Sequence, residues 1–151
     1  MKRREGYELN ANYNPKKVVF TFTSVGDKGS IEKIIEFYCF DNNLWNLGFG
    51  DVKGDDWEDN VISDNNDFRK VLQTVANSIH QFCDMYPYQD IQIVPLDYQR
   101  KLLYNRIFQQ KWREIEALFI VKGRILSAEN PIFKDYKPSE LVDEFIISRK
   151  N

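Results

Sequence analysis

The hydrophobic pattern of this chain changes its period between residues 52 and 68, and that change limits the folds available to it. From Lys17 to Val25 the segment KVVFTFTSV alternates β-branched and aromatic side chains between two faces, which is typical of a strand. From Phe68 to Tyr86 apolar residues recur in steps of three and four, which predicts an amphipathic helix. A chain that carries both patterns must pack helices on a sheet, so we expect an α+β fold.

The remaining segments extend this plan. Residues 31–40 and 44–52 alternate as further strands, and the turns GDKGS and DNN join them to residues 17–25 in an antiparallel meander. Residues 90–96 form a short, mostly apolar strand, which favours a central position, and Asp97 is placed to cap a helix over residues 98–112. Strands at 117–125 and 141–150 complete the order β-β-β-α-β-α-β-β. We expect a mixed, mostly antiparallel sheet of about six strands with two main helices, in a single domain over residues 1–151.

Composition excludes some classes of protein. The 21 basic and 23 acidic residues leave a net charge of −2, which argues against a DNA-coating protein but allows a local basic patch. Cys39 and Cys83 lie in apolar segments without CxxC spacing and are expected to be buried thiols of a reducing compartment. The basic start MKRREGYELN has no apolar run behind it, and no apolar run is long enough to cross a bilayer. We expect a cytoplasmic protein with no membrane partner.

The stretch LGFGDVKGDDWEDNVISDNND, residues 47–67, is dense in glycines, carboxylates and amides. Its glycine spacing matches neither a dinucleotide fingerprint nor a P-loop, and its seven carboxylates would repel a phosphate. An irregular calcium or magnesium site is conceivable on four of its residues, Asp51, Asp55, Asp56 and Asp59, although the spacing is not that of an EF-hand. We favour a simpler interpretation, in which the loop starts a helix and Asn66 or Asp67 caps it.

Residues of hydrolase chemistry are scarce. His80 is the only histidine and lies beside the apolar stripe of its helix, so we expect it at the surface and not as a catalytic base. Cys83 follows three residues later, but its predicted direction is into the core, so no Cys–His pair is expected. The sequence contains no serine-nucleophile elbow, HExxH or paired-cysteine zinc pattern, and we expect no cofactor.

The second predicted helix, YQRKLLYNRIFQQKWR, interleaves basic and aromatic side chains. Its aromatic residues include Tyr98, Tyr104 and Trp112, and its basic ones are Arg100, Lys101, Arg106, Lys111 and Arg113. Such a helix can bind nucleic-acid phosphates or an acidic partner. In two competing interpretations the cations only cover a solvated helix face, or they pair with the acidic residues 51–67.

Three motifs resemble those of a family of small uncharacterised bacterial proteins. They are FGD at residues 49–51, NxDxxKVLxTV at residues 65–75 and RxxLY at residues 100–104. The resemblance covers about residues 7–125 and implies a common fold without an established activity. It also implies a shared cluster of side chains in which Arg100 contacts one of the carboxylates. The members of this cluster are Gly50, Asp51, Asp56, Asn66, Asp67, Arg100 and Tyr104. The turn VPLDYQ replaces the Gly/Ser/Thr-rich approach to the arginine that the resemblance leads us to expect.

The order of elements is also similar to the C-terminal part of the GNAT acetyltransferase superfamily, in which a strand meander is followed by a helix, a strand and a second helix. In that superfamily the last helix often carries an AxxLY pattern whose tyrosine serves as general acid, and Tyr104 stands at the matching position. The superfamily binds the coenzyme A pyrophosphate with an (R/Q)xxGx(G/A) turn, where this chain has the acidic SDNND. The resemblance therefore implies a shared topology but not a shared coenzyme A site.

These observations rank three functions. We expect first a non-enzymatic interaction or regulatory module of a bacterial or phage-like system, whose partner is another protein. Its expected interaction cluster consists of Asp51, Asp56, Asp67, Arg100, Tyr104 and Arg106. The alternatives are a divergent acyltransferase with Tyr104 as its catalytic residue, and a nucleic-acid-binding module acting through the basic helix. The sequence leaves the oligomeric state open.

Overall fold

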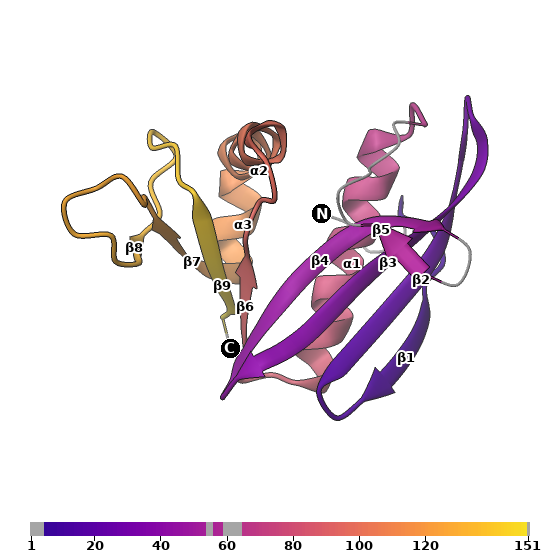
Figure 1. The fold of residues 1–151 in the computed structure, drawn as a ribbon, viewed down its shortest axis with the longest axis horizontal. Helices are drawn as coiled ribbons and strands as arrows, with labels where there is room; N and C mark the ends of the chain where they lie inside the picture. The colour runs from indigo at the N-terminus through magenta and orange to yellow at the C-terminus, as the bar shows by residue number, and fades with distance from the viewer. Residues whose placement is uncertain (1–4, 54–55, 59–64, 151) are drawn as a thin grey trace.

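The computed structural model describes residues 5–53, 56–58 and 65–150, which form a mixed sheet with helices packed against it (Figure 1). The strands are β1 (Asn10–Asn14), β2 (Lys17–Gly26), β3 (Gly29–Asp41), β4 (Leu44–Lys53), β5 (Asp56–Glu58), β6 (Asp90–Ile93), β7 (Phe119–Arg124), β8 (Lys134–Asp135) and β9 (Glu144–Arg149). The helices are α1 (Phe68–Met85), α2 (Tyr98–Gln110) and α3 (Trp112–Leu118). The α+β class and the mostly antiparallel sheet are confirmed.

The order of the strands across the sheet is β1-β2-β3-β4-β6-β9-β7-β8, with β5 paired to β4 beside this path. Each of these pairings is antiparallel except that of β4 with β6. As its apolar sequence predicted, β6 lies inside the sheet, between β4 and β9.

The parallel contact between β4 and β6 is short. Leu44–Asn46 pair with Asp90–Gln92, after which β6 ends at Ile93 while β4 continues to Lys53. Figure 1 shows the two strands starting together and diverging into a V. Within the described residues, β4 between Leu47 and Gly50 pairs with β3 along one edge and with no strand along the other. The sheet is therefore open at this point.

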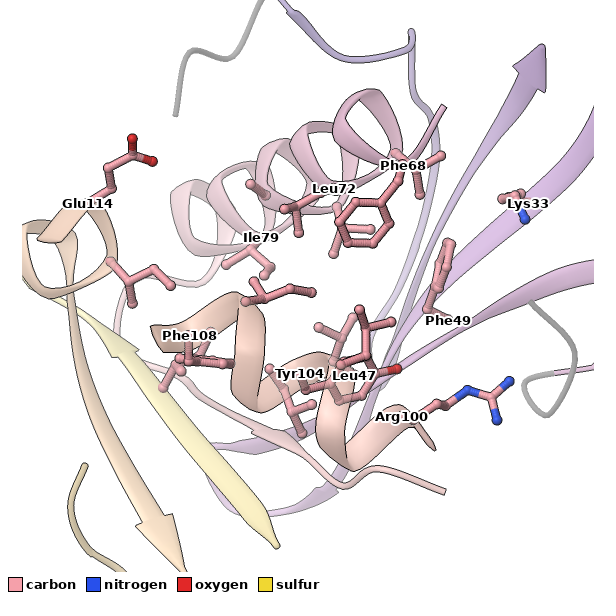
Figure 2. A pocket seen from close by; sticks show the side chains of 18 of the residues that line it. Lys33, Leu47, Phe49, Phe68, Leu72, Ile79, Arg100, Tyr104, Phe108 and Glu114 are labelled. Carbon is pink, nitrogen blue, oxygen red and sulfur yellow. The ribbon is translucent and has the colours of Figure 1, made fainter. Parts of the chain in front are cut away.

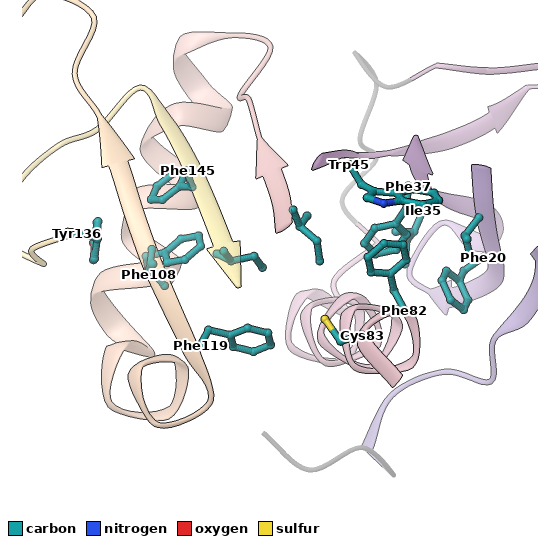
Figure 3. Close-up of a cluster of buried hydrophobic side chains, with 14 of the residues drawn as sticks. Phe20, Ile35, Phe37, Trp45, Phe82, Cys83, Phe108, Phe119, Tyr136 and Phe145 are labelled. Carbon is teal, nitrogen blue, oxygen red and sulfur yellow. The ribbon is translucent and has the colours of Figure 1, made fainter. Parts of the chain in front are cut away.

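Aromatic side chains pack both helix layers against the sheet (Figure 3). Phe82 of α1 stacks on Phe37 of β3 with the ring centroids 4.4 Å apart. Phe108 of α2 stacks on Phe145 of β9 at 4.2 Å. All four side chains are buried, and parallel offset rings add to the free energy gained from their burial. Both stacks belong to one buried hydrophobic cluster that runs under the two helices.

The sequence missed three short strands, β1, β5 and β8. All five residues of β1 are exposed, so its sequence NANYN has no apolar alternation to reveal it. Strand β8 has only two residues, and both are exposed. Strand β5 has three residues, which pair antiparallel with the end of β4. Neither β1 nor β8 has a buried face that a hydrophobic pattern could report.

The second predicted helix is longer than expected and is divided. α2 ends at Gln110, and α3 continues to Leu118 through residues that were assigned partly to a strand. The Lys111 N–H donates to the Ile107 carbonyl, and the Ile115 N–H donates to the Lys111 carbonyl. These hydrogen bonds carry the helical path across the junction, so the following strand begins only at Phe119.

Both cysteines are free thiols; Cys83 is buried and Cys39 is half-buried. Burial raises the pKa of the Cys83 thiol to about 11, and the neighbouring Arg149 opposes this shift. Among the described helices, none is both long and apolar enough to cross a membrane.

Candidate functional site

A cavity of about 560 Å³ lies between α1 and α2, where β4 and β6 diverge (Figure 2). Its apolar lining includes Leu72 and Ile79 of α1, Leu103 and Ile107 of α2, and Leu47, Phe49 and Ile93 of the sheet. Its polar lining includes Lys33, Asn65, Asp67, His80, Asp97, Arg100, Tyr104 and Glu114. Pockets for small molecules have volumes of roughly 300–1,000 Å³ and the same kind of lining, mostly apolar with a few polar groups.

The apolar stripe of α1 turns toward this cavity and not wholly into the core. Phe82 and Cys83 of the stripe are buried in the core as expected, whereas Leu72, Val75 and Ile79 are half-buried and line the cavity. Phe68, at the start of the stripe, is 47% exposed. Polar side chains of the same helix, Gln73, Thr74, Asn77 and Ser78 among them, are buried instead. The N-terminal segment covers that side: the Tyr7 N–H donates to Thr74 Oγ1 at 2.7 Å. The helix thus leaves much of its apolar face to the cavity.

A buried ion pair lies behind one wall of the cavity. Lys33 of β3 and Asp51 of β4 are cross-strand partners, and Lys33 Nζ lies 2.6 Å from Asp51 Oδ1. Both residues are about 1% exposed. Lys33 Nζ also lies 5.7 Å from the centre of the Phe49 ring. Lys33 occupies an inward position of its strand together with Ile35 and Phe37, and a lysine within an apolar alternation is the sequence signal that could have identified this pair.

Arg100 brings a second buried cation to the cavity. It lies in the first turn of α2 and is 7% exposed. Its Nη1 donates to Asp97 Oδ2 at 2.6 Å, and this carboxylate is 48% exposed. Asp97 also caps the helix, as predicted, by accepting from the Arg100 N–H at 2.8 Å. The buried Arg100 Nε has no hydrogen-bond partner in the described part of the chain.

Asp67 is the N-cap residue of α1, but the predicted capping hydrogen bond is wrong. Its side chain makes no bond to the helix backbone. It accepts instead from the Tyr7 hydroxyl at 2.7 Å and from Ser24 Oγ at 2.5 Å. Tyr7 belongs to the N-terminal segment and Ser24 to the end of β2, and both lie within hydrogen-bond distance of this carboxylate. Burial, and then the hydrogen bond to Asp67, raise the pKa of Tyr7. A carboxylate at this helix start disfavours a bound phosphate, in agreement with the sequence.

Asn65 and Asn66 connect the β2–β3 turn to the start of α1. Asn65 is fully buried, and its Oδ1 accepts from the Lys28 N–H at 2.5 Å while its Nδ2 donates to the Gly29 carbonyl at 2.8 Å. Asn66 has a φ of 59°, a left-handed conformation that asparagine tolerates better than most residues. These contacts fix the cavity wall at the beginning of α1.

His80 is not at the surface, so that prediction is wrong. It is 8% exposed and lines the cavity, with its ring 5.6 Å from that of Phe119 at the start of β7. The strands and helices that follow α1 in the chain cover this side, which the helix pattern alone does not reveal. Tyr104 also lines the cavity and is half-buried.

The predicted interaction cluster is only partly assembled. Asp67, Arg100 and Tyr104 line the same cavity, whereas Arg106 is exposed on α2. Asp51 is buried in its pair with Lys33. Among the described residues, two cations of α2 form ion pairs with acids outside residues 51–67: Arg100 with Asp97, and Lys101 with Asp143. Arg113 is exposed and Lys111 is half-buried.

The suggested metal site gains no support from the described residues. Asp55 and Asp59, and the side chain of Asp56, lie outside them. Asp51 carries the ion pair with Lys33. In the part of the chain that the structure describes, no three His, Cys, Asp or Glu side chains gather in a way that could hold a metal ion.

Comparisons with known proteins place the chain in a family without assigning it an activity. No curated protein matches the chain, and no solved structure matches it. A model of a family of unknown function, DUF6934, matches residues 3–150, nearly the whole sequence. This agrees with the predicted resemblance to an uncharacterised family. The chain belongs to the DUF6934 family of unknown function.

Proposed function

We propose that this protein is a non-enzymatic binding module whose interaction site is the cavity between α1 and α2, and that its ligand is a small molecule with an apolar body. The observation that carries the proposal is the direction of the α1 stripe, since Leu72, Val75 and Ile79 face a cavity of about 560 Å³. Leaving apolar side chains half-buried forgoes about 25 cal/mol for each Å² that stays uncovered, and a ligand would recover this free energy.

The surroundings of the cavity support a preformed site. Aromatic stacking fixes the core under both helices, and the Asn65 contacts fix the start of α1. A rigid wall loses little conformational entropy when a ligand binds, which favours affinity. The cavity lies between two helices and has a mostly apolar lining with a few polar groups, which suits a small molecule.

The test is an NMR titration of protein labelled at the Ile, Leu and Val methyl groups, with 1-decanol and with decanoate as apolar probes. We expect saturable shifts at the methyl groups of Leu72, Ile79 and Leu103, which line the cavity. A titration in which neither probe shifts these signals would overturn the proposal.

A blocking variant and a matched control sharpen this test. Leu72→Trp places a larger side chain in the cavity, into which Figure 2 shows Leu72 pointing, and should abolish binding of both probes. Leu102→Trp makes the same change at a leucine of α2 that is 41% exposed and should leave binding unchanged. Equal effects of the two variants would mean that the probes bind elsewhere.

A second candidate function is a divergent GNAT-like acyltransferase that uses Tyr104 as general acid. The divergence of the parallel strands β4 and β6, and the unpaired edge of β4 between Leu47 and Gly50, favour it. Tyr104 lines the cavity that opens there. The start of α1 opposes it, because the Asp67 carboxylate occupies the position where a coenzyme A pyrophosphate would bind.

A titration with acetyl-CoA separates the two functions. Saturable amide shifts near Asp67 and Tyr104, together with loss of acyl transfer in Tyr104→Phe, would favour the acyltransferase. A flat titration to millimolar acetyl-CoA, with decanol or decanoate still bound, would favour the binding module.

A further inference from the structure

We infer that the ligand of this cavity carries a carboxylate and that Arg100 binds it; this inference rests on the proposed binding function and specifies the class of ligand. Arg100 lines the cavity, is 7% exposed and has a buried Nε without a hydrogen-bond partner among the described residues. A buried guanidinium donor that is left unpaired is unfavourable, and a ligand oxygen would satisfy it.

The geometry of Arg100 leaves one edge of the guanidinium for a ligand. Its Nη1 is used by the exposed carboxylate of Asp97 at 2.6 Å. On the opposite edge, Nε is buried and has no hydrogen-bond partner among the described residues. In a guanidinium, Nε and Nη2 carry two parallel N–H groups that match the two oxygens of a carboxylate. Figure 2 shows the Arg100 side chain extending from the first turn of α2 away from Tyr104 and Ile79, on the side of the cavity where Phe49 lies.

The charges around the cavity favour a single negative charge over a phosphate. Lys33 is paired with Asp51, whereas the buried Arg100 Nε has no hydrogen-bond partner among the described residues. Asp67 and Glu114 also line the cavity and would repel a dianion more strongly than a singly charged carboxylate. A carboxylate needs one bidentate partner, and its apolar chain can then lie along Leu103, Ile107 and Ile79.

The experiment compares three probes of equal chain length: decanoate, 1-decanol and decylamine. Their dissociation constants are measured by calorimetry with the wild-type protein and with Arg100→Gln. We expect the wild type to bind decanoate most tightly and decylamine most weakly. Arg100→Gln should weaken decanoate by roughly 10- to 100-fold, which is the effect of removing a charge-assisted hydrogen-bonded pair, and leave decanol within about 3-fold.

Three further variants keep the test decisive. Arg106→Gln removes an exposed cation from the same helix and should not change decanoate binding. Asp97→Ser keeps a capping oxygen for α2 but removes the acid that competes for Arg100, so decanoate should bind more tightly. Arg100→Lys keeps the charge without the bidentate edge and should give an intermediate affinity, which also covers the case that Arg100→Gln does not fold.

A spectroscopic measurement distinguishes a direct contact from a structural role. With decanoate labelled with ¹³C at its carboxyl group, the bound carboxyl pKa should be lowered in the wild type and restored in Arg100→Gln. If Arg100→Gln weakens the binding of decanoate and of decanol equally, or weakens the binding of neither, the carboxylate inference is wrong while the binding function stands. If no probe binds the wild type, both the inference and the proposed function are wrong.

Discussion

The ammonium of Lys33 lies 2.6 Å from the carboxylate of Asp51, and the two side chains belong to neighbouring strands at positions that are about 1% exposed. Removing one member of a buried pair leaves the other charge without its partner in a region that excludes water. We therefore expect Lys33→Met and Asp51→Asn each to lower the free energy of unfolding by about 3–5 kcal/mol, measured by urea denaturation.

The exposed pair Lys122–Asp135 provides the control for this prediction. Its side chains are 47% and 86% exposed, so Lys122→Gln should change the free energy of unfolding by no more than about 1 kcal/mol. The double variant Lys33→Met/Asp51→Leu should be more stable than either single variant, because no charge then remains buried. Single variants as stable as Lys122→Gln would show that the pair is not buried in solution.

Gly26 should not tolerate a side chain. A Cβ atom at this position would lie 1.9 Å from the backbone oxygen of Asn65, so Gly26→Ala forces the start of α1 away from β2. We expect a loss of about 1–3 kcal/mol in the free energy of unfolding, with amide shifts concentrated at residues 65–67. Gly29→Asn is the comparison: Gly29 has a φ of 84° and open space around it, which asparagine tolerates, so its loss should be smaller. The reverse order of the two losses would contradict the prediction.

Asn105 should be needed to hold α2 against the segment before β9. Its Oδ1 accepts from the Val142 N–H and its Nδ2 donates to the Val142 carbonyl, both at 2.9 Å, and both residues are buried. Asn105→Leu leaves these two backbone groups without partners and should destabilise the fold by about 2–3 kcal/mol, with faster hydrogen exchange of the Val142 amide. Gln109→Leu, at an exposed position of the same helix, should stay within about 0.5 kcal/mol of the wild type.

Stability should fall as the pH rises from about 9 to about 11. Burial raises the pKa of the Cys83 thiol from 9.0 to about 11, and the pKa values of Tyr7 and Tyr136 are raised above 10.0 for the same reason. The unfolded chain therefore loses these protons before the folded chain does. The stabilisation is complete below pH 9 and is lost as the pH rises through the folded pKa values.

Cys83→Ala isolates the thiol in this pH dependence. Urea denaturation at a series of pH values between 8 and 11.5 should give a flatter decline for this variant, whatever its stability at pH 8. Identical slopes for the wild type and Cys83→Ala would show that the thiol does not contribute.

The sequence by itself was sufficient to predict elements whose formation depends on a local, periodic pattern of residues. The alternation from Val18 to Phe22 gave β2, the three-and-four spacing gave α1, and Asp97 gave the cap of α2, because each depends on neighbours along the chain. The central position of β6 followed from its apolar composition in the same way. The chain also belongs to a family of unknown function, in agreement with the expected resemblance to an uncharacterised family.

Only the tertiary structure decided which side chains meet in the cavity. Lys33 comes from β3 and Arg100 from α2, and no spacing along the chain reveals that both line one cavity at the divergence of β4 and β6. The expected exposure of His80 was wrong, and only part of the α1 stripe, including Phe82 and Cys83, is buried in the core. An amphipathic pattern shows that a helix has an apolar side, but not whether core, cavity or solvent lies opposite each residue of that side. That depends on long-range packing between elements, which local periodicity does not encode.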